Sequence, residues 1–124
     1  LEEFEQVEVK AVMGRGDAIV YSWKLTEGET VYSDFHADPH DVDSFPELYF
    51  VRYHESEEAR EAGSLIAPFR GNHGWYWLNI EETPITIELQ VHGYFESLEE
   101  IMRSFQWDEE VTNIRKMNIK RLKI

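Results

Sequence analysis

The sequence predicts a mainly β protein: an antiparallel β-sandwich or jelly-roll-like fold with a short C-terminal helix and tail. About seven short runs alternate between apolar and polar residues, as half-buried strands do. Turn signals separate these runs, and no long helical patterns lie between them, which favours antiparallel strands. At 124 residues, of which 42% are hydrophobic, the chain suits one compact core. We expect the sandwich over residues 1–96, with residues 97–124 as an appendage.

Three strands are predicted near the N-terminus, over residues 4–13, 18–24 and 30–36, because apolar side chains recur there at every second position. Asp34 and His36 fall on the second face of the third strand. The residues expected on the first face of each strand are Val7, Val9, Ala11 and Met13, then Ile19, Tyr21 and Trp23, then Val31, Ser33 and Phe35.

The middle of the chain is more polar. An acidic loop is expected over residues 37–46, followed by a strand over 48–54. The charged segment 55–62 predicts a helical turn or a mobile loop. A short strand over 64–69 and a glycine-bounded turn over 71–74 complete this region.

Residues 74–95 predict a hairpin in which residues 81–84 form the loop. One face pairs Ile80 with Ile85, Leu78 with Ile87 and Tyr76 with Leu89, and is expected to be core. The other face pairs Asn79 with Thr86, Trp77 with Glu88, Trp75 with Gln90 and His73 with His92. We therefore predict a ligand-binding or partner-binding face made by Trp75, Trp77, Glu88 and His92. The alternative is that both tryptophans belong to the core, if the sheet is covered on both sides.

The C-terminal segment combines a helix signal with a basic tail. Ser97 and Glu100 match a capping box, which predicts a helix over residues 97–105. From residue 106 the pattern fits neither the strand nor the helix period cleanly, so both remain open. Five of the twelve basic residues lie in the last ten positions, where no acid occurs. They are expected to contact an anionic membrane, an acidic partner or the chain's own acidic domain. These residues are Arg115, Lys116, Lys120, Arg121 and Lys123.

The composition excludes several functions. A formal net charge of −13 argues against nucleic-acid binding, which depends largely on Lys and Arg. The absence of cysteine excludes disulfides, thiolate zinc sites and a cysteine nucleophile. No apolar run approaches the roughly 18 residues that a membrane span needs, so we expect any membrane anchor to lie upstream of Leu1.

Histidines supply the strongest chemical signal. His36, His54 and His73 each stand at a predicted strand boundary, and with Asp34 they form a candidate site for a transition metal, namely zinc, copper, nickel or iron. The spacing matches no metal-binding motif, so a structural role for the imidazoles stays open. If the strands over 30–36 and 48–54 were adjacent and antiparallel, His36 and His54 would lie about 20 Å apart at ~3.3 Å per residue. A shared site therefore requires the link between them to cross between sheets.

Several segments resemble the extracytoplasmic domain of the bacterial transmembrane anchor protein family, over roughly residues 7–96. The resemblance is carried by Tyr21-Ser-Trp23, by Val31-Tyr-Ser-Asp-Phe-His36, by Tyr53-His54-Glu-Ser56, by Phe69-Arg-Gly-Asn-His-Gly-Trp-Tyr-Trp77 and by Pro84-Ile-Thr-Ile-Glu-Leu89. It implies a membrane-tethered domain on the periplasmic side of the bacterial inner membrane, and it points to Asp34, His36, His54 and His73 for a ligand. The strand pattern is more distantly similar to a GOLD-like β-sandwich, which implies architecture alone.

Three functions follow as expectations. The first is a membrane-tethered binding module that holds a transition metal or a small polar ligand through its histidines. The second is a structural accessory subunit of a membrane protein complex, with the tryptophan face and the basic tail as contacts. An enzyme is the third, and it would need an open coordination position beside a general base such as Glu88.

Overall fold

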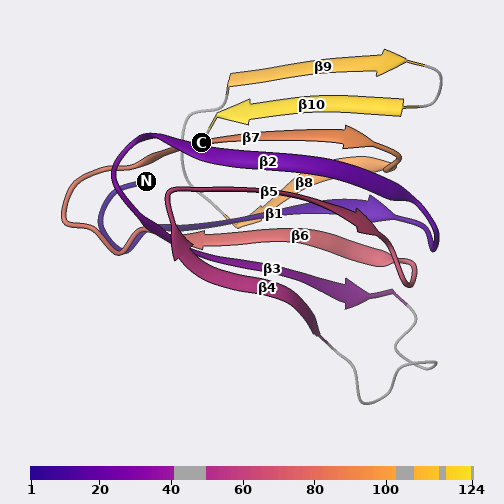
Figure 1. Ribbon diagram of the computed structural model, residues 1–124, viewed down its shortest axis with the longest axis horizontal. Helices are drawn as coiled ribbons and strands as arrows, with labels where there is room; N and C mark the ends of the chain where they lie inside the picture. The colour runs from indigo at the N-terminus through magenta and orange to yellow at the C-terminus, as the bar shows by residue number, and fades with distance from the viewer. Residues whose placement is uncertain (41–49, 103–107, 115–116, 124) are drawn as a thin grey trace.

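The computed structural model consists of two five-stranded antiparallel sheets that pack face to face (Figure 1), which confirms the predicted β-sandwich. The structure describes residues 1–40, 50–102, 108–114 and 117–123, with side chains described as far as residue 99. Within these residues, no helix is long and apolar enough to cross a membrane.

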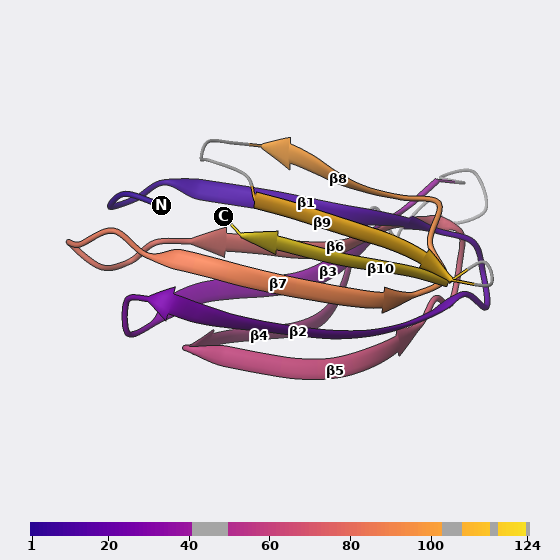
Figure 2. The ribbon, with the colours of Figure 1, turned by 90° about the horizontal axis from the view of Figure 1, so that it is seen from above.

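The first sheet, sheet A, has the strand order β4-β3-β6-β1-β8. Its strands are β1 Gln6–Met13, β3 Val31–Pro39, β4 Val51–Glu58, β6 Gly71–Leu78 and β8 Ser97–Met102. The second, sheet B, has the order β5-β2-β7-β10-β9. Its strands are β2 Ala18–Glu27, β5 Arg60–Ile66, β7 Thr86–Gly93, β9 Asp108–Ile114 and β10 Met117–Lys123. Figure 2 shows the two layers from above, with β4 of sheet A and β5 of sheet B along the same edge.

The core lies between the sheets and is rich in aromatic rings. The alternation predicted for β1 and β2 is confirmed, since Val7, Val9, Ala11, Met13, Ile19, Tyr21 and Trp23 are buried. Trp75 stacks on Phe35 with ring centroids 5.0 Å apart, and Trp77 meets Trp23 edge to face at 5.9 Å. Such ring pairs add about 0.5–1.5 kcal/mol each beyond the apolar area that they bury. The outer face of a sheet is used below for the face turned away from this core.

Residues 55–62 form neither a helical turn nor a loop, so that prediction is wrong. β4 extends to Glu58, and β5 begins at Arg60 with only Ala59 between them. β5 pairs with β2 over its whole length, with Gly63 opposite Tyr21. Glutamate and alanine have high helix propensity, but propensity is a weak predictor, and ladder hydrogen bonds with a neighbouring strand override it here.

The predicted hairpin over 74–95 is wrong in its pairing. β6 pairs with β1 and β3 in sheet A, whereas β7 pairs with β2 and β10 in sheet B. The segment between them crosses from one sheet to the other, and buried Asn79 organises the crossing. Its amide donates to the carbonyls of Leu1 (2.9 Å) and Thr83 (3.0 Å), and its oxygen accepts from the backbone N–H of Glu81 (2.8 Å). The crossing reverses the expected face of β6, which directs its tryptophans into the core.

The turn predicted over residues 71–74 is also wrong, because these residues begin strand β6. A Cβ at Gly71 would lie 2.4 Å from the backbone oxygen of Asp38, and one at Gly74 would lie 2.0 Å from that of Val9. Both glycines therefore permit close approach of neighbouring strands rather than reversal of the chain.

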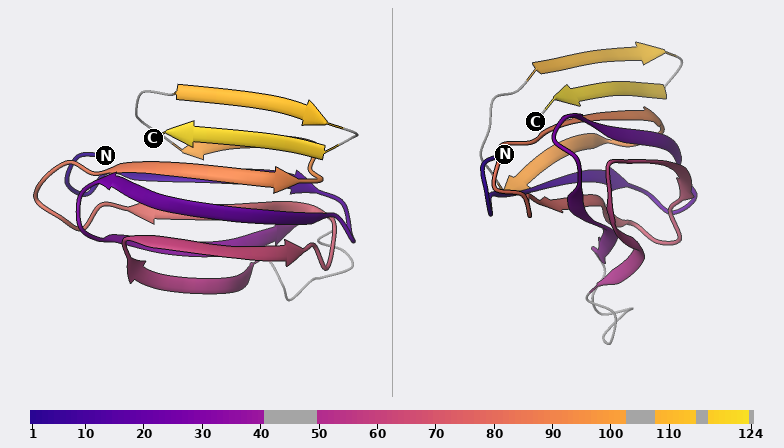
Figure 3. Two further views of the ribbon diagram at one scale, coloured as in Figure 1. Left: turned by 45° about the horizontal axis from the view of Figure 1, so that its top comes forward. Right: turned by 60° about the vertical axis from the view of Figure 1, so that its left-hand side comes forward.

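The C-terminal segment takes part in both sheets, as Figure 3 shows. The helix predicted over 97–105 is wrong as far as residue 102, because Ser97–Met102 forms β8, which pairs with β1. Residues 103–105 lie outside the described part of the chain. Backbone groups on the open side of β1 offer ladder hydrogen bonds, which outweigh the capping signal. Beyond residue 106, where the sequence pattern left two alternatives, β9 and β10 are strands. The division at residue 96 stays a prediction.

Candidate functional site

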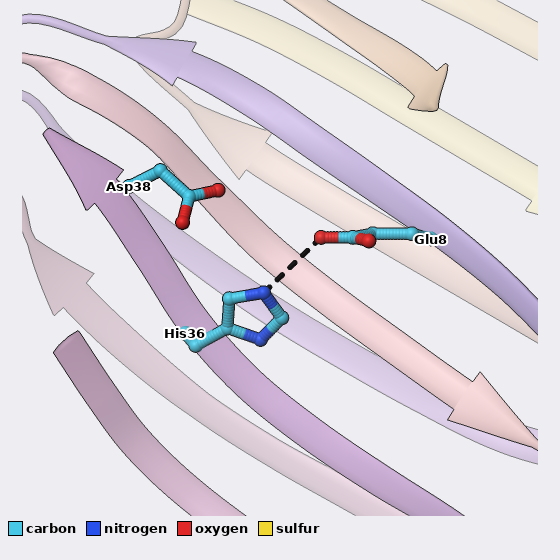
Figure 4. A group of neighbouring side chains, drawn as sticks. All are labelled: Glu8, His36 and Asp38. Carbon is cyan, nitrogen blue, oxygen red and sulfur yellow. Dashed lines mark hydrogen bonds and ion pairs between the residues drawn. The ribbon is translucent and has the colours of Figure 1, made fainter. Parts of the chain in front are cut away.

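A cluster of charged side chains lies on the outer face of sheet A. Within the described residues, Glu8, His36 and Asp38 offer three ligand atoms that all lie within 4.8 Å of one another. Glu8 projects from β1, His36 and Asp38 project from β3, and β6 runs between the two strands (Figure 4). We call these three residues together with Lys10 the acid–histidine cluster.

Gly74 provides the floor of the cluster. It lies in β6 opposite Lys10 of β1 and opposite His36 of β3, so the three residues form one row across the sheet. Because glycine has no side chain, nothing at position 74 stands between the lysine and the histidine. The side chains of β1 and β3 can therefore meet over β6.

Lys10 is buried within this cluster, with 1% of its surface exposed. Its ammonium lies 3.2 Å from Oε1 of Glu8 and 3.6 Å from Oδ2 of Asp38, and it donates to the backbone oxygen of His36 at 3.4 Å. Burial lowers the pKa of Lys10 below its ordinary value, although the two carboxylates oppose that change. The ammonium is thus the resident counter-ion of Glu8 and Asp38.

The hydrogen bonds of His36 fix its tautomer. Nδ1 lies 3.1 Å from the carbonyl oxygen of Asp34, which can only accept, so Nδ1 carries a proton. Nε2 lies 3.1 Å from Oε1 of Glu8. The pKa of Glu8 is lowered, first by its hydrogen bond with His36 and then by Lys10, so Glu8 is ionised. Nε2 is therefore the ring nitrogen that faces the carboxylate of Glu8 and the one available to bind a cation.

Asp34 and Phe50 surround the cluster. The guanidinium of Arg52 donates to Asp34 at 2.8 Å and 3.1 Å, so this predicted ligand is already in a two-point ion pair. Phe50 stacks on His36 with ring centroids 4.5 Å apart. The guanidinium carbon of Arg52 lies 5.4 Å from the centroid of the Phe50 ring. The stacking on Phe50 restricts rotation of the imidazole.

The structure does not bring the three predicted histidines together. β3 and β4 are adjacent and antiparallel in sheet A, and their register pairs His54 with Phe35 rather than placing it at the far end of β3. The exposed imidazole of His54 contacts Glu61 of β5 at 3.4 Å. His73 is in the core and pairs with Ala37, which places it on the face of sheet A opposite to that of His36.

His73 is fully engaged as a structural residue. Its Nε2–H donates to the carbonyl of Phe69 (3.0 Å), and its Nδ1 accepts from the hydroxyl of Tyr53 (2.9 Å). No lone pair remains for a metal. Burial lowers the pKa of His73, and burial raises the pKa of Tyr53 to about 12, so both groups are neutral at pH 7.

His73 predicts a stability that falls in mild acid. Its folded pKa lies below the ordinary value of 6.5, so the unfolded chain binds the proton more readily, and stability is lost as the pH falls below about 6.5. Carboxylates such as Glu8, whose ordinary pKa is 4.5, add their own loss at lower pH. The check is the free energy of unfolding from urea titrations between pH 7.5 and 5 with chelator present. His73→Gln should flatten this slope, whereas an unchanged slope would assign the effect to another group.

The predicted tryptophan face does not exist as one surface. Trp75 and Trp77 are 0% exposed, whereas Glu88 and His92 lie on β7 with alternate burial that turns them outward from sheet B. His92 pairs with Val20 of β2, not with His73. Glu88 and His36 therefore stand on opposite outer faces, and Glu88 is too remote to act as a base beside the acid–histidine cluster.

The structure describes only part of the basic tail. Lys120, Arg121 and Lys123 belong to β10, whose backbone pairs with Val91, Gln90 and Glu88 of β7. Arg115 and Lys116 lie outside the described residues. A role of these five residues in binding a partner stays a prediction.

Sequence reasoning missed Glu8, Lys10, Asp38 and Gly74 as site residues. A signal was present, because Glu8 and Lys10 alternate with the apolar residues of β1, and Asp34, His36 and Asp38 do the same in β3. The missing information was that β6 brings these two polar faces into one sheet. Comparisons with protein-family models, with curated proteins and with solved structures found no match.

Proposed function

We propose that this protein is a binding module that holds one divalent transition metal ion through Glu8, His36 and Asp38. The observation that carries the proposal is the position of Nε2 of His36, 3.1 Å from a carboxylate oxygen and with its tautomer fixed by the Nδ1–H hydrogen bond. An imidazole nitrogen and carboxylate oxygens are suitable ligands for zinc, copper, nickel or iron. The carbonyl that accepts from Nδ1 is the kind of second contact that orients metal-binding histidines.

The geometry needs a modest closure. Ligand atoms around a tetrahedral zinc ion lie about 3.4 Å apart, given metal–ligand distances near 2.1 Å. Glu8 and His36 already meet this spacing at 3.1 Å, whereas the widest separation in the cluster is at most 4.8 Å. Asp38 is the ligand that can move, because its side chain is 44% exposed and it lies near the end of β3. Three protein ligands would leave a coordination position for water or a small ligand.

Metal titration tests this proposal. We expect His36→Gln to weaken zinc or nickel binding by more than about 100-fold, since even outer partners of metal ligands are worth 10–100-fold. His92→Gln is the matched control, because His92 lies on sheet B and should leave binding unchanged. The measurement is isothermal titration calorimetry on untagged protein, with elemental analysis of the purified chain. Equal affinities for the parent and His36→Gln would sink the site.

Lys10 should oppose the metal, because its ammonium occupies the same acidic environment. Removing it in Lys10→Met leaves Glu8 and Asp38 without their buried counter-ion, which should lower the stability of the metal-free protein by about 3–5 kcal/mol. A divalent ion should restore that stability, and its affinity should exceed that of the parent by about tenfold or more. Thermal melts with zinc and with EDTA check both effects. A Lys10→Met melt that zinc leaves unchanged would contradict the proposed competition.

The membrane tether and periplasmic location form part of the proposal and rest on the sequence resemblance alone. The alternative, an accessory subunit of a membrane complex, loses its tryptophan contact surface because Trp75 and Trp77 are buried. Its remaining support is the basic segment that includes β10. We therefore place metal capture first.

A further inference from the structure

The outer face of sheet B contains a hollow of about 450 Å³, on the opposite side of the sandwich from the acid–histidine cluster. It lies over β5, β2 and β7. Its floor is low because Ser22 and Ala62, both small, face each other across β2 and β5. Longer side chains form its walls. The lining residues are Ser22, Trp23, Lys24, Arg60, Glu61, Ala62, Glu88 and Gln90.

Two cations form one wall. Lys24 and Arg60 are directly opposite each other in the β2–β5 ladder. The side chain of Lys24 is 58% exposed, and its ammonium is 4.0 Å from Oε1 of Glu88, so this ion pair is weak. Within the part of the chain that the structure describes, the side chain of Arg60 has no hydrogen-bond or ion-pair partner. Glu61 also lines the hollow, but its carboxylate contacts His54 and accepts a hydrogen bond from Ser56. In a protein of net charge −13, the free donors of the two cations therefore favour an anionic ligand group.

The wall formed by β7 offers acceptors, and its Glu88 lies opposite Lys24 in the β2–β7 ladder. Glu88 and Gln90 stand side by side on β7, and the amide of Gln90 donates to Oε1 of Glu88 at 3.4 Å. The other carboxylate oxygen of Glu88, the amide oxygen of Gln90 and the hydroxyl of Ser22 remain for a ligand. Such groups accept hydrogen bonds from the hydroxyls of a polar molecule. The backbone of β10 borders this wall, with Arg121 opposite Gln90.

We infer that this hollow binds a small hydroxylated carboxylic acid. Arg60 and Lys24 hold the carboxylate, and Glu88, Gln90 and Ser22 receive the hydroxyl groups. The volume lies within the range of about 300–1,000 Å³ that small-molecule sites occupy. This ligand is separate from the proposed metal, since the two sites face away from each other.

The test uses D-glucuronate as the probe and D-glucose as a neutral molecule of the same ring shape. Titration of each sugar into isotopically labelled protein is followed by NMR at low and high salt. We expect glucuronate to shift amides of β2, β5 and β7 in a saturable way that weakens with salt, and glucose to leave them unchanged. Absence of saturable glucuronate binding, or equal shifts with glucose, would overturn the inference.

Variants locate the binding. Arg60→Gln should weaken glucuronate by about tenfold, the loss expected when one charge-assisted contact is removed. Arg15→Gln is the matched control, because Arg15 is exposed in the turn between β1 and β2 and should have no effect. Ala62→Leu keeps every charge but fills the floor, and should abolish binding in a protein whose melt stays cooperative. An equal loss in Arg60→Gln and Arg15→Gln would reduce the interaction to general charge attraction and remove the site. His36→Gln should bind glucuronate like the parent whatever its effect on metal.

Discussion

Trp75→Ala is expected to destabilise the protein by about 3–5 kcal/mol, the cost of truncating a fully buried large aromatic side chain. Trp75 is 0% exposed, stacks on Phe35 at 5.0 Å and meets Tyr21 edge to face at 5.2 Å. Removing the indole leaves a cavity between the sheets. Phe35 and Tyr21 cannot move in to fill it, because the strands that carry them are fixed in the sheets. Equilibrium urea denaturation gives the free-energy change, with an unchanged m-value as evidence that only stability has altered.

Its neighbour Tyr76 supplies the control. Tyr76 is half-buried on the outer face of sheet A, where its hydroxyl donates to Gln6 and its ring meets Tyr32. Tyr76→Ala should cost only about 1 kcal/mol, typical of a partly exposed position. Trp75→Phe should also cost much less than Trp75→Ala, because among the described residues the indole N–H has no hydrogen-bond partner to lose. A larger effect at Tyr76 than at Trp75 would indicate that the tryptophans are exposed, and would contradict the orientation of β6.

Gly74→Ala is expected to lower stability by about 3 kcal/mol or more. A Cβ at this position would lie 2.0 Å from the backbone oxygen of Val9 and 2.8 Å from Cα of Lys10. Both atoms belong to the backbone of β1, so no side-chain rotation relieves the clash, and the central pair of sheet A must separate. The displacement would also move Glu8 and Lys10 away from His36. Metal binding, if present in the parent, should therefore weaken in parallel with the melt.

Gly14→Ala tests whether this cost belongs to glycine in general. A Cβ at Gly14 would meet its nearest atom, Oδ2 of Asp17, at 3.4 Å and the guanidinium of Arg70 at 3.8 Å. These are ordinary contacts with flexible side chains, so the substitution should change stability by less than about 1 kcal/mol. Similar melts for the Gly74 and Gly14 variants would contradict the close approach of β6 to β1.

The fold class and the inward faces of β1 and β2 could be predicted because strict alternation of apolar residues is a local property. Pairing is not local. Residues 74–95 have the spacing of a hairpin, yet β6 and β7 join different sheets through a crossing that depends on the hydrogen bonds of Asn79 with Leu1 and Thr83. The contact of Asn79 with Leu1 joins positions 78 residues apart, and such a contact leaves no mark on the local pattern.

The candidate site shows the same limit. The alternation of β3 correctly separated His36 from Phe35, but the histidine's partner Glu8 comes from β1 and the space for both comes from Gly74 of β6. The sequence pattern places His73 in one predicted metal site with His36 because both stand near predicted strand ends. One residue of offset in the register directs them to opposite faces of the same sheet. Strand periodicity thus identifies polar faces, whereas strand order decides which of those faces meet.

The strand order also dictates when the chain can fold. β6 is the middle strand of sheet A and β7 the middle strand of sheet B, so neither sheet has a centre until residues 71–93 are present. Of the eight pairings among the described residues, only β3 with β4 and β9 with β10 join consecutive strands. During synthesis, the apolar faces of β1 and β2 stay exposed to solvent until more than half of the chain has been made. Such distant pairings make folding slow, on the order of milliseconds to seconds, and leave the nascent chain dependent on protection from aggregation.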